Sequence, residues 1–141
     1  EGKVQQLPVK QHRTKTTNRY FNYIYVRMGA HTLIHKRTED DIWKNLFELP
    51  LVETEKDLSE EEFLACPQFH ALFAEGEVRM VRILLRGVKH VLSHRVIYTN
   101  FYEVTLPDNS SSFSSYQRVA VEDLGRYAVP RLIHAFLEKY V

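Results

Sequence analysis

The sequence predicts a single α+β domain in which a mixed β-sheet packs against two or three helices. Segments rich in aromatic and β-branched residues, which are typical of strands, are interspersed with segments that carry helix signals. The chain of 141 residues is 44% hydrophobic and 12% aromatic, which is enough to bury a sizeable core. Its length corresponds to one domain. We therefore predict a basic connector over residues 1–18 and one folded domain over residues 19–141.

Strands dominate the first part of the predicted domain. Residues 19–27 have the composition of a strand, residues 29–30 supply a turn, and residues 31–37 return as the partner strand. The run over residues 36–53 then turns apolar at Ile42 and contains the only tryptophan. It is too irregular for a helix, so it predicts a buried crossing of strand, turn and short strand. Its predicted core positions are Trp43, Leu46, Phe47 and Leu49.

A capping box predicts the first helix. The Ser59 hydroxyl can accept from the third helical N–H group, and Glu62 can reach back to the Ser59 amide. We expect this helix to break or restart at Pro67. A second apolar run with helical spacing then continues as far as Gly76, which is suited to a helix C-terminus.

Two further strands follow. Residues 77–87 alternate in part and predict a strand with a basic outer face. Gly87 allows a bend, and residues 95–106 carry apolar side chains on both faces, which predicts a central strand. Residues 107–115 have the composition of a flexible loop. The alternation of the first strand places on one side Val81, Ile83 and Leu85, and on the other side Arg82 and Arg86.

The chain ends in a short strand, a short helix and a longer helix. Residues 118–119 predict the strand, and residues 121–124, closed by Gly125, predict the short helix. Pro130 is suited to the first position of the last helix. That helix carries one apolar stripe, made of Leu132, Ile133, Phe136, Leu137 and Tyr140.

The net charge of +1 conceals a segregation of charge along the chain. Residues 1–20 contain five basic side chains against one acid, and residues 79–95 contain five with no acid. Between them, residues 36–62 contain four basic and ten acidic side chains. Two basic segments that flank an acidic one can form a positive face suited to phosphates. Charges that merely fill solvent-facing strand positions explain the same pattern, so both interpretations stay open.

Residues that commonly perform catalysis or bind metals form no recognisable cluster. His31 and His35, like His90 and His94, are four residues apart, a spacing that separates strand side chains by about 13 Å. Packing or solvent exposure explains these histidines better than a metal site. Ser93 beside His94 is not a catalytic dyad, because adjacent strand residues point to opposite faces. The sequence therefore predicts neither catalytic residues nor a metal site.

The single cysteine also argues against reactive chemistry. Cys66 precedes a proline and has no basic neighbour to activate its thiol, so we expect it in the core. One cysteine excludes an internal disulfide and a multi-cysteine metal site in this chain, which fits a reducing, intracellular setting. There is no signal peptide and no apolar run of the roughly 20 residues that a membrane helix needs. Because the sequence begins at Glu1 without a methionine, we expect a longer parent protein.

An ordered set of motifs connects the chain with a known family. In order, these are RYFNYIYV from Arg19, HKRTEDDIWKNLFELPLVE from His35, a helix, KHVLSH from Lys89, and a long strand. The connector LPVKQHRTKT and the closing EDLGRYAVPRLIHAFL complete the set. Over nearly its whole length, the chain resembles the C-terminal domain of MutY-type adenine DNA glycosylases. The resemblance implies a Nudix-like fold and, for the full enzyme, removal of adenine mispaired with 8-oxoguanine in base excision repair.

The chain departs from the pattern of true Nudix hydrolases. Those enzymes place a glycine ahead of a helix that carries an Arg-Glu pair and two further glutamates, which bind magnesium. Here no glycine lies between Gly29 and Gly76, and no arginine lies between Arg37 and Arg79. Pyrophosphohydrolase activity is therefore not supported, and a divergent Nudix hydrolase is kept as the first alternative.

The resemblance also assigns roles to residues. The family's loop that recognises the oxidised guanine matches Leu92, Ser93 and His94, although a phenylalanine is frequent at the position of Leu92. Ser93 would read the lesion, and neighbouring groups would contact the DNA backbone. These backbone contacts are assigned to Lys89, His90 and Arg95. No catalytic residue and no metal ligand are expected in this chain.

By the same resemblance, the catalytic helix-hairpin-helix region and its 4Fe-4S cluster belong to an upstream part of the protein. The expected partners are double-stranded DNA containing 8-oxoguanine:adenine, the protein's own N-terminal catalytic domain, and a replication or repair protein. No membrane is expected, and the expected location is intracellular, in the cytoplasm or nucleoid. The second alternative is an interaction module that binds a repair protein at residues 1–18 or 107–115.

Overall fold

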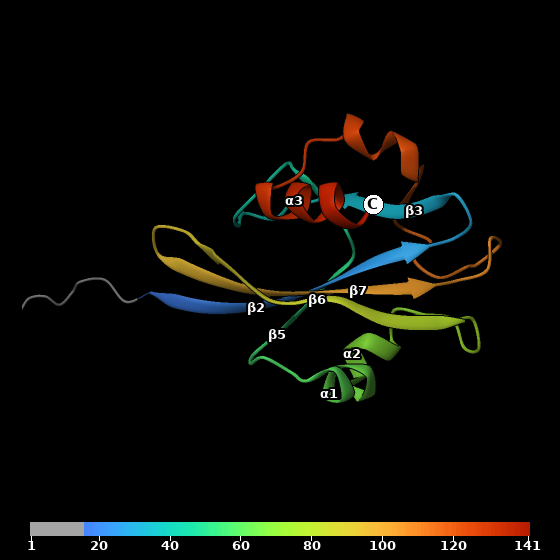
Figure 1. The fold of residues 1–141 in the computed structure, drawn as a ribbon, viewed down its shortest axis with the longest axis horizontal. Coiled ribbons are helices and arrows are strands. Elements are labelled where there is room, and N and C mark those ends of the chain that lie inside the picture. The colour runs from blue at the N-terminus through green and yellow to red at the C-terminus, as the bar shows by residue number, and fades with distance from the viewer. Residues whose placement is uncertain (1–15) are drawn as a thin grey trace, which may run out of the picture.

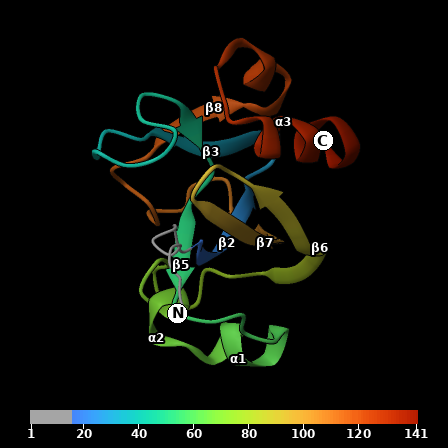
Figure 2. The same ribbon diagram turned by 90° about the vertical axis from the view of Figure 1, so that its left-hand side faces the viewer.

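The computed structural model describes residues 16–141, which form three layers (Figures 1 and 2). A four-stranded sheet lies in the middle, with two short helices on one side and one helix plus a three-stranded sheet on the other. This arrangement confirms the predicted α+β class. The helices are α1 (Glu60–Ala65), α2 (Pro67–His70) and α3 (Arg131–Tyr140). Within the described residues, no helix is long and apolar enough to cross a membrane.

The four-stranded sheet has a spatial order of β5 (Leu51–Thr54), β2 (Thr17–Arg27), β7 (Arg95–Thr105) and β6 (Met80–Val91). It is mixed, because β2 and β7 run parallel while the β2–β5 and β6–β7 pairs are antiparallel. Most side chains of β2 and β7 are buried, so the apolar pattern of residues 95–106 correctly predicted a central strand. One face of the sheet, the α3 face, packs against α3, and the opposite α1 face packs against α1 and α2.

The start of β2 lies inside the segment predicted as a connector. Thr17 and Asn18 already belong to the strand, where they pair with the beginning of β7. Residues 1–15 of the predicted connector lie outside the described residues.

The second sheet is antiparallel and contains β4 (Phe47–Glu48), β3 (His31–Lys36) and β8 (Gln117–Ala120). The predicted hairpin between residues 19–27 and 31–37 is wrong. The chain does turn at Gly29, whose φ is 62°, and Met28 and His31 form a single bridge. However, β7 pairs with β2 along its whole length and β5 pairs with Tyr20–Tyr23 on the other edge, while β3 crosses into the second sheet and pairs with β4 and β8.

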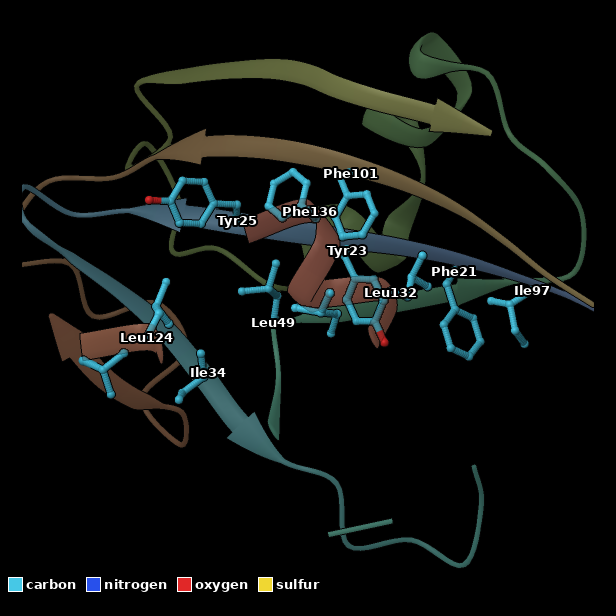
Figure 3. Packing of buried hydrophobic residues seen from close by; sticks show 12 residues of the cluster. Phe21, Tyr23, Tyr25, Ile34, Leu49, Ile97, Phe101, Leu124, Leu132 and Phe136 are labelled. Atoms are coloured by element: carbon cyan, nitrogen blue, oxygen red, sulfur yellow. The ribbon is translucent and has the colours of Figure 1, made fainter. Parts of the chain in front are cut away.

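Aromatic side chains fill the space between the α3 face and α3 (Figure 3). Phe101 of β7 and Phe136 of α3 stack with ring centroids 4.2 Å apart. Leu132 and Ile133 are buried beside them, which confirms the predicted apolar stripe of the last helix. The helix begins one residue later than predicted, because Pro130 is its N-cap and not its first residue.

The capping box at the start of α1 is confirmed. Glu62 N donates to Ser59 Oγ at 3.1 Å, and Ser59 N donates to a Glu62 carboxylate oxygen at 2.9 Å. The bond from the Ser59 amide lowers the pKa of Glu62. Phe63 comes next, is fully buried and stacks with Tyr102 at 4.6 Å, so the cap orients the residue that fixes α1 to the sheet. Cys66, expected in the core, is half-buried between α1 and α2.

The run over residues 36–53 contains the end of β3, a turn, β4 and β5, as its pattern predicted. Leu49 is buried, but the other predicted core residues, Trp43, Leu46 and Phe47, are half-buried. Trp43 and Phe47 pack against the edge of the core on the α3 face. The turn takes Trp43 and Asn45 through the left-handed region, with φ of 59° and 74°, so it leaves the sheet before it reaches the core.

A buried carboxylate in this run is the centre of a polar network. Glu48 is 2% exposed and accepts hydrogen bonds from the Tyr23 hydroxyl at 2.7 Å and from Arg37 at 2.9 Å. Arg37 also bonds to Asp41 at 3.0 Å. His35 Nε2 lies 3.0 Å from the second Glu48 oxygen, without the alignment of a hydrogen bond. Burial, and then the Glu48 charge, raise the pKa of Tyr23 well above its ordinary value. The network connects β2 with the second sheet.

Composition predicted a flexible loop at residues 107–115, but part of this segment is packed. Ser112 and Phe113 are 8% and 9% exposed. Glu77 accepts from the hydroxyls of Ser110 at 2.5 Å and Ser112 at 2.8 Å, and these bonds lower the pKa of Glu77. The segment leads into β8 and then into η2 (Val121–Arg126), a 3-10 helix where a short helix was predicted.

Candidate nucleic-acid interface

The predicted recognition residues form the tip of the β6–β7 hairpin. Leu92, Ser93 and His94 connect the strands, and Leu92 N donates to the Arg95 carbonyl at 2.8 Å. The start of β2 holds the tip from the side, because Thr17 donates to the His94 carbonyl from its amide at 3.1 Å and from its hydroxyl at 3.2 Å. Ser93 and His94 are exposed, whereas Leu92 packs against the core. The Ser93 side chain is therefore exposed to solvent on a restrained backbone.

Strand alternation divides the predicted contact residues between the two faces of the sheet. His90 and Leu92 lie on the α3 face. Lys89 is exposed and pairs with Tyr98 on the α1 face. Arg95 is half-buried at the first position of β7. The structure therefore does not bring Lys89 and His90 onto one surface, and their contacts with DNA stay predictions.

Trp43 lies against the hairpin on the α3 face. Its indole ring meets the His90 imidazole edge-on with centroids 6.0 Å apart, and it meets Phe21 at the same distance. The Arg37 guanidinium lies 6.0 Å from the indole centroid. Trp43 thus supports the hairpin through its contact with His90. Sequence reasoning missed this contact, because no local pattern indicates which strand a turn residue will meet.

Two irregularities shape β6 before it reaches the tip. Its register with β7 shifts between Ile83 and Leu85, and again between Leu85 and Val88. Each shift exchanges the faces of the residues that follow. Val81 and Ile83 consequently pack on the α1 face, while Leu85 and Val88 pack on the α3 face. The prediction that Leu85 shares a side with Val81 and Ile83 is therefore wrong.

The predicted common basic face of Arg82 and Arg86 is wrong for the same reason. Arg82 bonds to Glu103, which also lies 3.4 Å from Arg27, beside a pocket at the C-terminal end of α3. Arg86 lies 3.2 Å from Asp57 on the α1 side. Each arginine is already paired with a carboxylate, so neither is a free positive charge for a phosphate.

Asparagine side chains hold the second irregularity in place. Gly87 has a φ of 71°, and its N–H donates to Asn100 Oδ1 at 2.8 Å. Asn100 Nδ2 donates to Asn22 Oδ1 at 3.2 Å, and Asn22 Nδ2 donates to the Val52 carbonyl at 3.1 Å. Asn22 and Asn100 are 1% and 4% exposed. We name Asn22 and Asn100 the asparagine row, and its hydrogen bonds connect all four strands of the sheet. The row lies between the part of the sheet that α1 covers and the hairpin.

Positive charge at the hairpin comes from two side chains. Arg19 of β2 is held by Asp41 and Glu53, both at 2.8 Å, and the bond from Arg19 lowers the pKa of Asp41 to about 2. Within residues 16–141, by contrast, no carboxylate lies within ion-pair distance of Lys89 or Arg95. Lys89 and Arg95 are thus basic side chains of the hairpin without a carboxylate partner among the described residues.

The acidic side chains at the start of α1 do not fit a magnesium site. Glu62 accepts from the Ser59 amide, and Glu60 and Glu61 occupy the same exposed first turn. Across the part of the chain that the structure describes, no group of three or more His, Cys, Asp or Glu side chains is placed to hold a metal ion. The carboxylates act as a helix cap and as a favourable charge at the helix N-terminus.

A mixed sheet and a smaller antiparallel sheet, flanked by helices on both sides, define a domain of the Nudix fold class. Residues 22–139 match the NUDIX domain, and the chain belongs to this family. No curated protein sequence matches the chain significantly.

Solved structures share the fold. The C-terminal domain of mouse MUTYH, in its complex with human PCNA, matches with a TM-score of 0.65 over 86% of each chain, at 14% identity. The MutT protein from Methanosarcina mazei Go1 matches with a TM-score of 0.56 at 18% identity, over 88% of this chain and 93% of its own. A MutT structure from work on Aliivibrio salmonicida and Vibrio cholerae gives 0.57 at 16% identity, over 87% and 96%. At these identities, the likeness shows the fold alone.

Proposed function

We propose that this domain recognises 8-oxoguanine opposite adenine in DNA, for a base-excision-repair adenine glycosylase whose catalytic region lies elsewhere in the protein. The observation that carries the proposal is the exposed Ser93 at the hairpin tip, on a backbone restrained by Leu92 and Thr17. The motif resemblance to MutY C-terminal domains and the likeness to the mouse MUTYH domain support it. In this role the domain reads DNA and performs no reaction of its own.

The chemistry of the lesion suits a hydroxyl on a restrained turn. Guanine presents N7 as an acceptor in the major groove. Oxidation turns N7 into an N–H donor and adds an acceptor oxygen at C8. The Ser93 hydroxyl can accept from the new N–H, while a backbone amide of the tip donates to the new oxygen. Normal guanine leaves one of these groups unpaired, which costs about 1–3 kcal/mol, or about a tenfold to hundredfold preference.

The other hairpin residues position the duplex. Lys89, Arg95 and the exposed His94 supply donors for phosphates, contacts that fix register without reading sequence. His90 faces Trp43, so its first role is to support the hairpin. Leu92 packs against the core, which favours an anchor over the aromatic packing role that a phenylalanine would allow.

A divergent Nudix hydrolase is the enzymatic alternative, since MutT proteins share the fold. The stretch from Ala30 to Glu75 contains no glycine, and the stretch from Thr38 to Val78 contains no arginine. Glu62, at the third position of α1, accepts a hydrogen bond from the Ser59 amide as part of the helix cap. These departures favour the reader over the hydrolase.

Removal of the reading hydroxyl tests the proposal. The change is Ser93→Ala in the 141-residue chain, with Ser115→Ala, another exposed serine, as the matched control. Competitive binding to duplexes that contain 8-oxoguanine:adenine or guanine:adenine measures the preference. We expect Ser93→Ala to reduce the ratio of the two affinities toward 1, whereas the control should keep the ratio of the unaltered chain. An unchanged preference in Ser93→Ala would remove Ser93 from this role.

A further inference from the structure

The hairpin carries a second candidate surface, on the α1 face of the sheet, where Lys89 and Val91 are exposed and Tyr20 and Tyr98 are half-buried. Helices α1 and α2 cover this face only on the far side of the asparagine row, and in Figure 1 the hairpin extends past them. Four side chains lie on the uncovered part, and we name them the tyrosine surface. They are Tyr20, Lys89, Val91 and Tyr98.

Strand pairing orders the tyrosine surface. Tyr20 of β2 pairs with Tyr98 of β7, and Tyr98 pairs with Lys89 of β6, so the three side chains form one row across the sheet. The two tyrosine rings stack, with centroids 5.5 Å apart and planes 16° apart. Stacked rings restrain each other, and each tyrosine has few rotatable bonds to immobilise. The two rings are therefore held together at low entropic cost.

The tyrosine surface lies outside the core of the α1 face. The core on the α1 face is formed by residues beyond the asparagine row, such as Ile24 and Tyr102, which pack under α1. Val91, in contrast, is 65% exposed although it is a large apolar residue that pairs with Val96 of β7. Val91 and its strand partner Val96 continue the row toward Ser93. An apolar and aromatic patch beside the candidate reading tip indicates a binding surface.

The composition of the surface fits a nucleic acid backbone. None of its four residues is acidic, and Lys89 has no carboxylate within ion-pair distance in the described chain. Tyrosine hydroxyls and lysine ammonium groups are common donors to DNA phosphates. The apolar Val91 suits the sugar between two phosphates.

We propose that the tyrosine surface contacts the DNA backbone of the duplex that flanks the lesion. The hydroxyls of Tyr20 and Tyr98 and the ammonium of Lys89 donate to phosphate oxygens, and Val91 packs against the intervening sugar. The inference rests on the proposed function in taking DNA as the occupant. It adds that the duplex lies along the α1 face of the hairpin, because Trp43 fills the α3 face.

Removal of the hydroxyls alone tests the inference without disturbing the fold. The double change Tyr20→Phe and Tyr98→Phe keeps the stacked rings, and Lys89→Gln removes the charge. The matched controls are Tyr127→Phe and Lys139→Gln, which lie on the α3 side of the molecule. Fluorescence anisotropy with the 8-oxoguanine:adenine and guanine:adenine duplexes, at several salt concentrations, measures the affinities.

The double tyrosine variant should bind both duplexes about tenfold more weakly. Lys89→Gln should lower the slope of log K against log salt by about 1, and the preference for the lesion should stay unchanged in both variants. Affinities within twofold of the controls would overturn the inference while leaving the lesion preference, and so the proposed function, intact. If the unaltered chain shows no lesion preference but the variants bind both duplexes more weakly, the inference would stand and the proposed function would be overturned. No binding to either duplex would overturn both.

Discussion

Replacement of Glu48 by glutamine removes the charge at the centre of the polar network and preserves the shape of the side chain. Glu48 is 2% exposed and receives hydrogen bonds from Tyr23 and Arg37. The Arg37 side chain is only 9% exposed, so water cannot replace the lost carboxylate charge. We therefore expect Glu48→Gln to lower the free energy of unfolding.

The magnitude follows from what the variant leaves in place. Removal of one partner from a buried ion pair costs about 3–5 kcal/mol, because the other charge stays buried without compensation. Asp41 still faces Arg37 at 3.0 Å, and the glutamine oxygen can still accept from the Tyr23 hydroxyl. The expected loss is therefore about 3 kcal/mol, at the lower end of that range. This is a large share of the 5–15 kcal/mol or so that stabilises a typical domain.

Urea unfolding followed by circular dichroism measures this loss, as a shift of the midpoint at constant slope. Glu53→Gln is the matched control, since it removes the same charge from a side chain that is 39% exposed and pairs with Arg19. The control should lose less than about 1 kcal/mol. Equal losses in the two variants would refute the reasoning, because burial would then make no difference.

Two further predictions concern Asp41, which contacts Arg37, and Glu61 in the first turn of α1. The pKa of Asp41 is lowered from 3.8 to about 2, chiefly by the bond from Arg19, so its contribution to stability is complete above its ordinary pKa and is lost as pH falls toward 2. Solvent screening limits this contribution to about 1 kcal/mol. Asp41→Asn should therefore weaken the fall of the free energy of unfolding between about pH 4 and pH 2. The same fall in Asp41→Asn and in the unaltered chain would contradict this. With magnesium and nucleoside triphosphates, the purified chain should release no pyrophosphate. Magnesium-dependent release that disappears in Glu61→Gln would instead identify a hydrolase.

Features that depend on neighbours in the chain were predictable from the sequence. The capping box needs only Ser59 and Glu62, which are three residues apart, and both of its hydrogen bonds form. The central position of residues 95–106 follows from apolar side chains on both faces, because only an interior strand buries both. The stripe of the last helix was predictable for the same reason, since its period is that of the helix itself.

Features that depend on strand pairing were not predictable. Residues 31–37 have the composition of a hairpin partner, yet β2 pairs with β5 and β7, and β3 joins a separate sheet. The two register shifts in β6 depend on contacts such as that of Gly87 N with the Asn100 side chain of another strand. One extra residue in a strand exchanges the faces of all that follow, so local alternation assigned Leu85 and Arg86 to the wrong sides.

The candidate site was predictable in part. Leu92, Ser93 and His94 came from motif resemblance, and the structure places them together at the hairpin tip. Tyr20 and Tyr98 lie far apart in the sequence, and only the parallel pairing of β2 with β7 brings their rings together. Alternation alone places each tyrosine on a face of its own strand, but it does not indicate that the two faces are the same.

Discrimination between 8-oxoguanine and guanine opposite adenine is the property on which the proposed function depends. Competition between two otherwise identical duplexes for the unaltered chain measures it in one titration. We predict a preference of about tenfold to hundredfold for the duplex that contains 8-oxoguanine. Equal affinity for the two duplexes, or no measurable binding of either, would contradict the assignment of this domain as a lesion reader.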